Sequence, residues 1–190
     1  MRACENPFRS ACVEGLDYEF ERGGWVDLIE RVEACGYRCA VVGGHGSGKT
    51  TLMAGLAARL RERGIGVRVV RAESDDAIGI AGLIEIVWGC RSDEVLVLDA
   101  AGLVSGIGWR VLRLASRRLS GLIISSHTEV GGLKTVLKTG SSPVCVSGMV
   151  DRLSGLEAVV SMHDCDEMLK RHHGNVRLVF RELYDRCASM

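Results

Sequence analysis

The sequence predicts an α/β domain in which helices flank a five-stranded parallel sheet. From residue 25 to residue 140, short apolar segments alternate with longer segments of helical periodicity. The apolar segments are continuous, as in strands whose sheet is covered on both faces. A glycine-rich segment also stands between the first predicted strand and the next helix, where parallel α/β domains commonly bind ligands.

Composition limits the classes of protein and partner. The 190 residues are 47% hydrophobic and 25% charged, as in a globular domain that buries a core. Lys and Arg number 24 and Asp and Glu number 24, so no overall field attracts nucleic acid or a membrane surface. No apolar segment is long enough to span a bilayer, and the eight cysteines form no C-x-x-C pair. We therefore expect a cytoplasmic protein with reduced thiols.

The predicted elements of the α/β domain follow one another in regular order. Trp25, Leu28 and Val32 lie at helical spacing, and Gly36 ends that helix. The sequence then predicts strands at 38–42, 65–70, 94–100, 121–127 and 134–140, with helices at 49–62, 76–90 and 109–119 between them. Right-handed crossovers are expected to connect the strands.

The strands end near residue 140, and the rest of the chain is expected to be helical. Helices are predicted at 144–155 and 157–171, and a further helix begins after Asn175, which stands at an N-cap position. The apolar residues of this last helix form one stripe: Val176, Val179, Phe180, Leu183, Tyr184 and Cys187. We divide the chain into an N-terminal arm at 1–24, an α/β domain at 25–143 and a short helical C-terminal lid at 144–190.

The segment VVGGHGSGKTTLM at 41–53 contains the phosphate-binding motif G-x-x-x-x-G-K-[ST]. Glycines let successive backbone N–H groups turn toward phosphate oxygens at a helix N-terminus, and the lysine adds a positive charge at the β- and γ-phosphates. The α/β domain is therefore predicted to have the P-loop NTPase fold. Its nucleotide-binding residues are expected to be Gly43, Gly44, His45, Gly46, Ser47, Gly48, Lys49, Thr50 and Thr51.

A second motif, VLVLDA, places Asp99 at the carboxyl end of a predicted strand. Asp99 would orient a Mg²⁺ ion, to which Thr50 would offer its hydroxyl. The usual hydrolytic arrangement continues with a glutamate that polarises the attacking water, whereas Ala100, Ala101 and Gly102 follow here. The sequence therefore supports Mg–ATP binding more strongly than hydrolysis.

Polar residues at other strand ends are candidates for the missing catalytic group. Ser126 and His127 end the fourth predicted strand, where a polar residue commonly contacts the γ-phosphate, and Glu129 lies just beyond. A second acidic group follows the second strand: Glu73, Asp75 and Asp76. A solvated loop is the simpler interpretation of that group.

Several segments together resemble the AAA-type branch of P-loop ATPases, especially small bacterial secretion and transposition ATPases: NPF, VVGGHGSGKTTLM, VLVLDA, LIISSH and HHGNVRLVFRELYD. The resemblance implies that Lys49, Asp99 and a polar residue at Ser126 or His127 act on the triphosphate. It also implies that Arg177, in GNVR, contacts the γ-phosphate from the lid. A cation at a helix start opposes the helix dipole, and a bound phosphate would offset that cost. Departures from the family are the missing glutamate, the short lid and the lack of an assignable arginine finger.

Two other groups of side chains have simpler interpretations. Arg110, Arg113 and Arg117 share one helix face that could bind nucleic acid or an acidic partner, but a solvated face is the simpler interpretation. His163, Asp164 and Cys165 match no standard zinc spacing, nor do the later His172 and His173.

The leading hypothesis is an AAA-like ATPase that couples ATP binding or slow hydrolysis to action on a protein partner. A non-hydrolysing ATP-dependent switch or adaptor is the first alternative, and the missing glutamate favours it. The second alternative is a small-molecule or nucleotide kinase in which Glu73 binds the acceptor. No N-K-x-D guanine motif is present.

Overall fold

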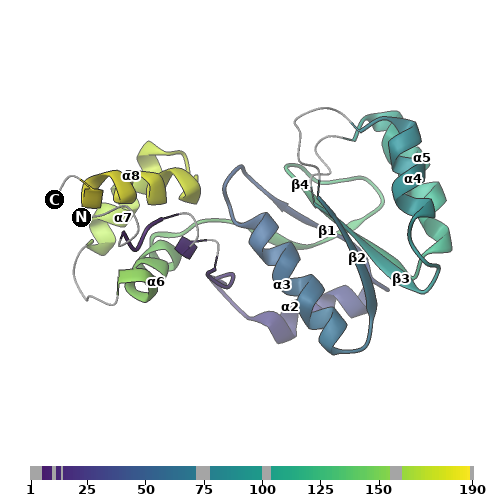
Figure 1. The fold of residues 1–190 in the computed structure, drawn as a ribbon, viewed down its shortest axis with the longest axis horizontal. Helices are drawn as coiled ribbons and strands as arrows, with labels where there is room; N and C mark the ends of the chain where they lie inside the picture. Colours follow the sequence, from purple (N-terminus) through teal and green to yellow (C-terminus); the bar gives the residue numbers. More distant parts are fainter. Residues whose placement is uncertain are drawn as a thin grey trace. The chain divides into compact units, whose positions relative to one another are not determined.

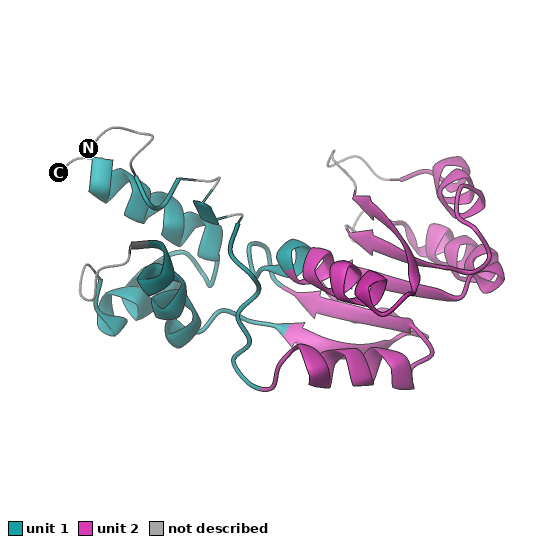
Figure 2. Ribbon diagram, turned by 60° about the horizontal axis from the view of Figure 1, so that its bottom comes forward, with its two compact units in different colours: residues 1–22, 44–51, 139–190 teal, residues 23–43, 52–138 magenta. Residues whose placement is uncertain are grey.

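The computed structural model describes residues 6–9, 12–13, 15–71, 78–99, 104–154 and 160–188. Figure 2 shows that the chain forms two compact units. One unit contains residues 1–22, 44–51 and 139–190 and is mainly helical, whereas the other contains residues 23–43 and 52–138 and holds the sheet.

The sheet has five strands: β1 (Arg38–Gly43), β2 (Gly66–Arg71), β3 (Glu94–Asp99), β4 (Gly121–Ser126) and β5 (Lys134–Thr139). Their order is β2-β3-β4-β1-β5, and the pairs β2–β3, β3–β4 and β1–β4 are parallel. In the register, Arg71 pairs with Asp99, and Val42 pairs with Ser126. The carboxyl ends of β1 to β4 therefore share one edge of the sheet.

Burial explains why the strand sequences differ. All six residues of β4 are buried, as are five of the six in β3. Apart from Glu94 at the start of β3 and the polar residues at the carboxyl ends, both strands are continuous apolar runs. The outer strand β2 buries Val67 but exposes Arg68 and Arg71. A charged outer strand is protected against pairing with another chain.

Helices cover both faces of the sheet (Figure 1). α2 (Trp25–Ala34) and α3 (Lys49–Glu62) lie on one face, and α4 (Ile80–Trp88) and α5 (Gly106–Ala115) lie on the other. The strand order explains this arrangement. The connection from β1 to β2 runs along the sheet in one direction, and the connections from β2 to β3 and from β3 to β4 run in the opposite direction. Because all of these crossovers are right-handed, the two directions place their helices on opposite faces. The predicted five-stranded parallel sheet with flanking helices is confirmed.

The helical unit has its own core. α6 (Pro143–Ser154), α7 (Met162–Arg171) and α8 (Val176–Ala188) enclose buried side chains that include Val146, Cys165 and Leu183. Phe8 joins them, with its ring centroid 6.1 Å from that of Phe180. The N-terminal segment thus contributes to the core of the helical unit.

Capping residues set the helix boundaries that differ from the predicted ones. α5 begins at Gly106 rather than at 109, because Ser105 Oγ accepts a hydrogen bond from Gly108 N at 3.1 Å. It ends at Ala115 and continues as the 3₁₀ helix η2 (Ser116–Arg118). α7 begins at Met162 rather than at 157, because Ser161 and Asp164 form a capping box.

The starts of α8 and α6 agree with their sequence signals. Asn175 Oδ1 accepts a hydrogen bond from Leu178 N at 3.3 Å, which confirms the predicted cap of α8. Pro143 takes the first position of α6, where its missing N–H costs nothing. The helix predicted at 76–90 is α4, but it begins later, at Ile80, and ends at Trp88, because Gly79 before it is extended. Residues 72–77 lie outside the described part of the chain.

Every described cysteine is a free thiol, and those at 39, 90, 145, 165 and 187 are buried. Burial raises the pKa of the Cys39 thiol to about 12, with a smaller contribution from Cys35, so this thiol is protonated. Within the described residues, no helix combines the length and the apolar character that crossing a membrane requires.

Candidate nucleotide-binding site

The predicted phosphate loop lies between β1 and α3, which begins at Lys49. Gly46 and Gly48 have positive φ angles of 68° and 82°, a conformation that side-chain-bearing residues rarely adopt. Alternation between such residues and ordinary ones turns successive N–H groups toward one point, which creates an anion-binding concavity. The backbone thus has the conformational features that the motif requires.

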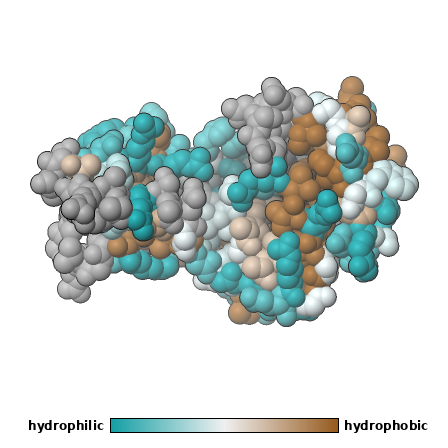
Figure 3. All heavy atoms as spheres, viewed as in Figure 1, coloured by the Kyte–Doolittle hydropathy of each residue, from teal (hydrophilic) through white to brown (hydrophobic). Residues whose placement is uncertain are grey.

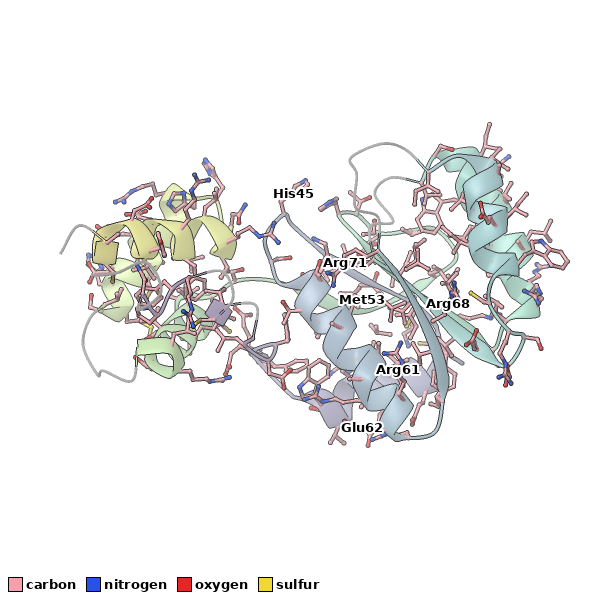
Figure 4. All side chains as sticks on the ribbon, in the orientation of Figure 1. His45, Met53, Arg61, Glu62, Arg68 and Arg71 are labelled. Atoms are coloured by element: carbon pink, nitrogen blue, oxygen red, sulfur yellow. The ribbon has the colours of Figure 1, made fainter. Side chains whose placement is uncertain are left out.

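Hydrogen bonds from side chains add to the backbone conformation of the loop. Ser47 is buried, and its hydroxyl donates to Gly44 O at 2.9 Å and lies 2.7 Å from Thr139 Oγ1, at the end of β5. Lys49 Nζ donates to Gly44 O at 2.5 Å, so the ammonium group lies over the loop. His45 stands at the outer turn, where it is exposed (Figure 4).

Two other side chains of the helical unit press against the loop glycines. A Cβ atom on Gly46 would lie 2.0 Å from Asn175 Oδ1, and one on Gly48 would lie 3.1 Å from the ring of Tyr18. These glycines therefore provide room as well as conformational freedom. Burial, followed by the charges of Cys145 and Glu21, raises the pKa of Tyr18 to about 12.

The contact with Asn175 brings the start of α8 beside the loop. Asn175 caps α8, and Arg177 lies in the first turn of that helix with an exposed side chain. Among the residues that the structure describes, no carboxylate pairs with the Arg177 guanidinium. The predicted lid arginine therefore belongs to the same compact unit as residues 44–51.

A separate polar cluster lies in the α/β unit at the ends of β2, β3 and β4. Asp99 is only 5% exposed, and Ser125 Oγ donates to its Oδ1 at 2.6 Å. Arg71 Nε lies 3.5 Å from Asp99 Oδ2 (Figure 4 labels Arg71 at the end of β2). Both carboxylate oxygens are thus oriented by neighbours, as expected of a group that positions an ion.

The two candidates at the end of β4 have defined hydrogen bonds. Ser126 is buried, and its Oγ accepts from Thr128 N at 3.3 Å. His127 is exposed, and its Nδ1 lies 3.2 Å from Gly43 O. Because a carbonyl oxygen can only accept, Nδ1 carries the proton, and in a neutral ring Nε2 holds the lone pair. His127 is therefore a better candidate than Ser126 for accepting a proton.

Of the acidic residues considered as candidates for the missing catalytic group, the structure describes only Glu129. Glu129 is exposed and bonds to Lys138 at 2.8 Å; this hydrogen bond and the lysine charge lower the pKa of Glu129. A lower pKa makes the carboxylate a weaker base. The remaining three, Glu73, Asp75 and Asp76, lie outside the described residues.

The residues of the discounted zinc pattern have structural roles. Asp164 caps α7, Cys165 is in the core, and His163 Nε2 lies 3.5 Å from Glu167 Oε1 on the same helix. Within the described part of the chain, no three His, Cys, Asp or Glu side chains converge to form a metal site.

The sequence did not reveal that Arg71 and Ser125 are partners of Asp99. Both stand at strand ends, but their contact with Asp99 depends on the order β2-β3-β4 and on the register that pairs Arg71 with Asp99. Neither can be read from one strand alone. The local signal was a polar residue ending each of three apolar strands.

Solved structures of related shape define the fold class, while no family model and no curated protein matches the chain. The chain is similar to the Holliday junction branch migration motor RuvB of Thermotoga maritima, with a TM-score of 0.55 and 16% identity over 83% of this chain and 58% of that chain. It is also similar to the replication initiator DnaA bound to AMPPCP and single-stranded DNA, with a TM-score of 0.60 and 18% identity over 90% of this chain and 62% of that one.

AMPPCP-bound DnaA from Aquifex aeolicus gives a TM-score of 0.52 and 15% identity, over 83% of this chain and 58% of that chain. The chain thus spans less than two thirds of the length of each of these proteins. At such identities the likeness is one of fold. It confirms that the chain has the P-loop NTPase fold predicted from its sequence.

Proposed function

We propose that the chain is an AAA-type ATP-binding protein whose phosphate loop, Gly43–Thr51, holds the triphosphate. The observation that carries this proposal is the loop conformation, with Gly46 and Gly48 at positive φ between a buried strand and a helix that starts at Lys49. A loop of this kind presents N–H groups and a helix N-terminus to an anion. The AMPPCP bound by the two DnaA structures is in keeping with ATP as the nucleotide.

A Mg²⁺ ion would be held by Asp99 and the Thr50 hydroxyl. Mg²⁺ commonly keeps several waters and takes one or two carboxylates together with phosphate oxygens, so a larger cluster of acids is not required. The burial of Asp99 and its hydrogen bond from Ser125 fit this role, because they hold a single carboxylate in a fixed orientation. When bound, the ion neutralises charge on the β- and γ-phosphates.

The γ-phosphate contacts are assigned to Ser126, His127 and Arg177, together with Lys49. His127 is the favoured proton acceptor, because Gly43 O fixes its Nδ1–H and the lone pair then lies on Nε2. Glu129 is the less favoured base, since Lys138 lowers its pKa. Hydrolysis by this arrangement is expected to be slow, because no acid directly follows Asp99.

A second function is an ATP-dependent switch that does not hydrolyse its nucleotide. The sequence Ala-Ala-Gly after Asp99 favours it. In both cases the start of α8 would report the state of the loop to a protein partner, since Asn175 contacts Gly46. The secretion or transposition type of AAA ATPase and a cytoplasmic location remain part of this proposal.

The test combines ATP binding and ATP turnover with Mg²⁺ for the wild type, Lys49→Ala and Asp99→Asn. Turnover above that of both variants would establish an ATPase and make His127→Ala and Glu129→Gln the next variants. Tight binding without turnover would establish the switch. No binding by the wild type would contradict both functions.

A further inference from the structure

Helices α4 and α5 leave large apolar side chains in water. Exposed fractions are 44% for Ile80, 39% for Ile84 and 67% for Trp88 on α4, and 67% for Ile107 and 66% for Leu114 on α5. Apolar spheres reach the surface on the side of Figure 3 where Figure 1 draws these helices. Scattered apolar residues need no explanation, but five on two packed helices are typical of an interaction site. We call them the α4–α5 surface.

The five residues form one surface. On each helix they recur at helical spacing, as one stripe along α4 and one along α5. The two helices pack closely, since a Cβ atom on Gly108 would lie 3.0 Å from Leu83 Cδ1. Both helices are right-handed crossovers on the same sheet face, so they run in the same direction. An α-helix has 3.6 residues per turn, so each stripe can be placed relative to the buried residues of its helix, which face the sheet. By this count the stripe of α4 lies on the side toward α5, and the stripe of α5 lies on the side toward α4.

Positive charge borders the apolar stripe of α5. From Gly106 to Arg118 the chain has four arginines and no acid: Arg110, Arg113, Arg117 and Arg118. Arg110 on α5 and Arg117 on η2 are exposed, and each follows an exposed apolar residue, Ile107 or Leu114, by three residues, which places it beside that residue. The whole chain has no net charge, so this is a local feature that complements an acidic partner.

The same features argue against nucleic acid as the partner. Phosphates would pair with the arginines but would leave the aliphatic stripes in water. Arg118 lies over the ring of Trp88 at 4.9 Å and donates to Val87 O and Cys90 O, so one ring face is already occupied. A base would therefore have only the other face for stacking.

We propose that the α4–α5 surface docks an acidic amphipathic helix of a partner protein. An apolar stripe of that helix would lie along the seam between α4 and α5, as helices commonly bind in apolar grooves. Acidic side chains beside that stripe would meet Arg110 and Arg117. The site is independent of the nucleotide proposal, and its test does not require ATP.

The probe is a labelled synthetic helical peptide with one leucine stripe flanked by glutamates, and fluorescence anisotropy measures its binding to the full chain. The control probes are the same peptide with lysine for glutamate and an oligo-dT strand. Ile107→Gln with Leu114→Gln should weaken binding about tenfold or more, because two exposed side chains lose their apolar contacts. Val26→Gln, at a residue 62% exposed on α2, is the matched control and should leave binding unchanged.

Charge reversal sharpens the test. The double variant Arg110→Glu with Arg117→Glu should no longer bind the glutamate peptide and should bind the lysine peptide instead. The reason is that it reverses the charge beside the apolar stripe and leaves the stripe itself unchanged. All four substituted residues are exposed, so both double variants should fold. Failure of the wild type to bind the acidic peptide would overturn the proposal. So would preferential binding of oligo-dT, or a dimer of the chain that Ile107→Gln with Leu114→Gln dissociates.

Discussion

The phosphate loop takes its shape from backbone conformation, whereas the cluster around Asp99 depends on side chains from three strands. In the loop, Gly46 and Gly48 supply positive φ angles and leave room for Asn175 and Tyr18. In the cluster, ordinary strand geometry brings Ser125 and Arg71 to one carboxylate.

The difference determines which substitutions each region tolerates. A side chain added to a loop glycine disturbs both the backbone and its neighbours. In the cluster, each substitution removes one hydrogen bond or one charge and leaves the strands in place. Loop substitutions are therefore expected to have larger effects than cluster substitutions.

The largest effect is expected for Gly46→Ala. A left-handed conformation costs a residue with a Cβ atom about 1–2 kcal/mol, and the contact with Asn175 adds to this cost. ATP binding, measured by calorimetry, should fall below detection, and urea denaturation should show the lost stability. Gly44→Ala is the matched control for the loss of stability, since Gly44 has no positive φ angle and a Cβ atom there meets nothing within 4 Å. Equal effects of the two variants would contradict the proposed role of the loop conformation.

Ser125→Ala should reduce the free energy of unfolding by about 1.5–3 kcal/mol, because it removes a hydrogen bond to a buried carboxylate. Urea denaturation measures the change. Ser120→Ala removes a hydroxyl that donates to Ser92 O at an exposed site and should cost less than about 0.5 kcal/mol. If the two variants are equally stable, the Ser125 hydrogen bond does not hold Asp99.

Arg71→Gln should lower the Mg²⁺ concentration needed for half-maximal ATP binding. The arginine competes with a cation for Asp99 Oδ2, but its side chain is 54% exposed, so the effect should be at most about fivefold. A Mg²⁺ titration at fixed ATP measures it. Arg68 lies on the same strand as Arg71 but pairs with Leu96 of β3, so Arg68→Gln should leave the requirement unchanged. An increased requirement would mean that Arg71 assists the ion.

The smallest effect concerns Tyr18. Its pKa of about 12 in the folded chain means that folding favours the neutral phenol. The corresponding stability is present below the ordinary pKa of 10.0 and is lost as the pH rises from there toward 12. Phenolate absorbance of the wild type minus that of Tyr18→Phe measures this titration. A midpoint near the ordinary value would show that Tyr18 is exposed and does not pack against Gly48.

The loop could be predicted from sequence because its determinants are contiguous. Strand, glycines, Lys49 and helix stand side by side in the chain, so their order alone defines the motif. The sheet could be predicted equally well from the sequence, because β3 and β4 contain continuous apolar runs that end in polar residues.

The Arg71 contact and the start of α7 were not predicted, for different reasons. Arg71 meets Asp99 only through pairing between strands, which one sequence does not reveal. The capping box of Ser161 and Asp164 was visible in the sequence, but the predicted start at 157 did not use it. Boundaries depend on single hydrogen bonds, whereas elements depend on many apolar contacts.

The most direct test of the central claim compares ATP with AMP as ligands of the wild type and of Lys49→Ala, by calorimetry with Mg²⁺. If Gly43–Thr51 holds the triphosphate, the wild type should bind ATP roughly ten- to a hundredfold more tightly than AMP, and Lys49→Ala should largely remove that difference. Equal affinities for the two nucleotides in the wild type, or an unchanged difference in Lys49→Ala, would contradict the account.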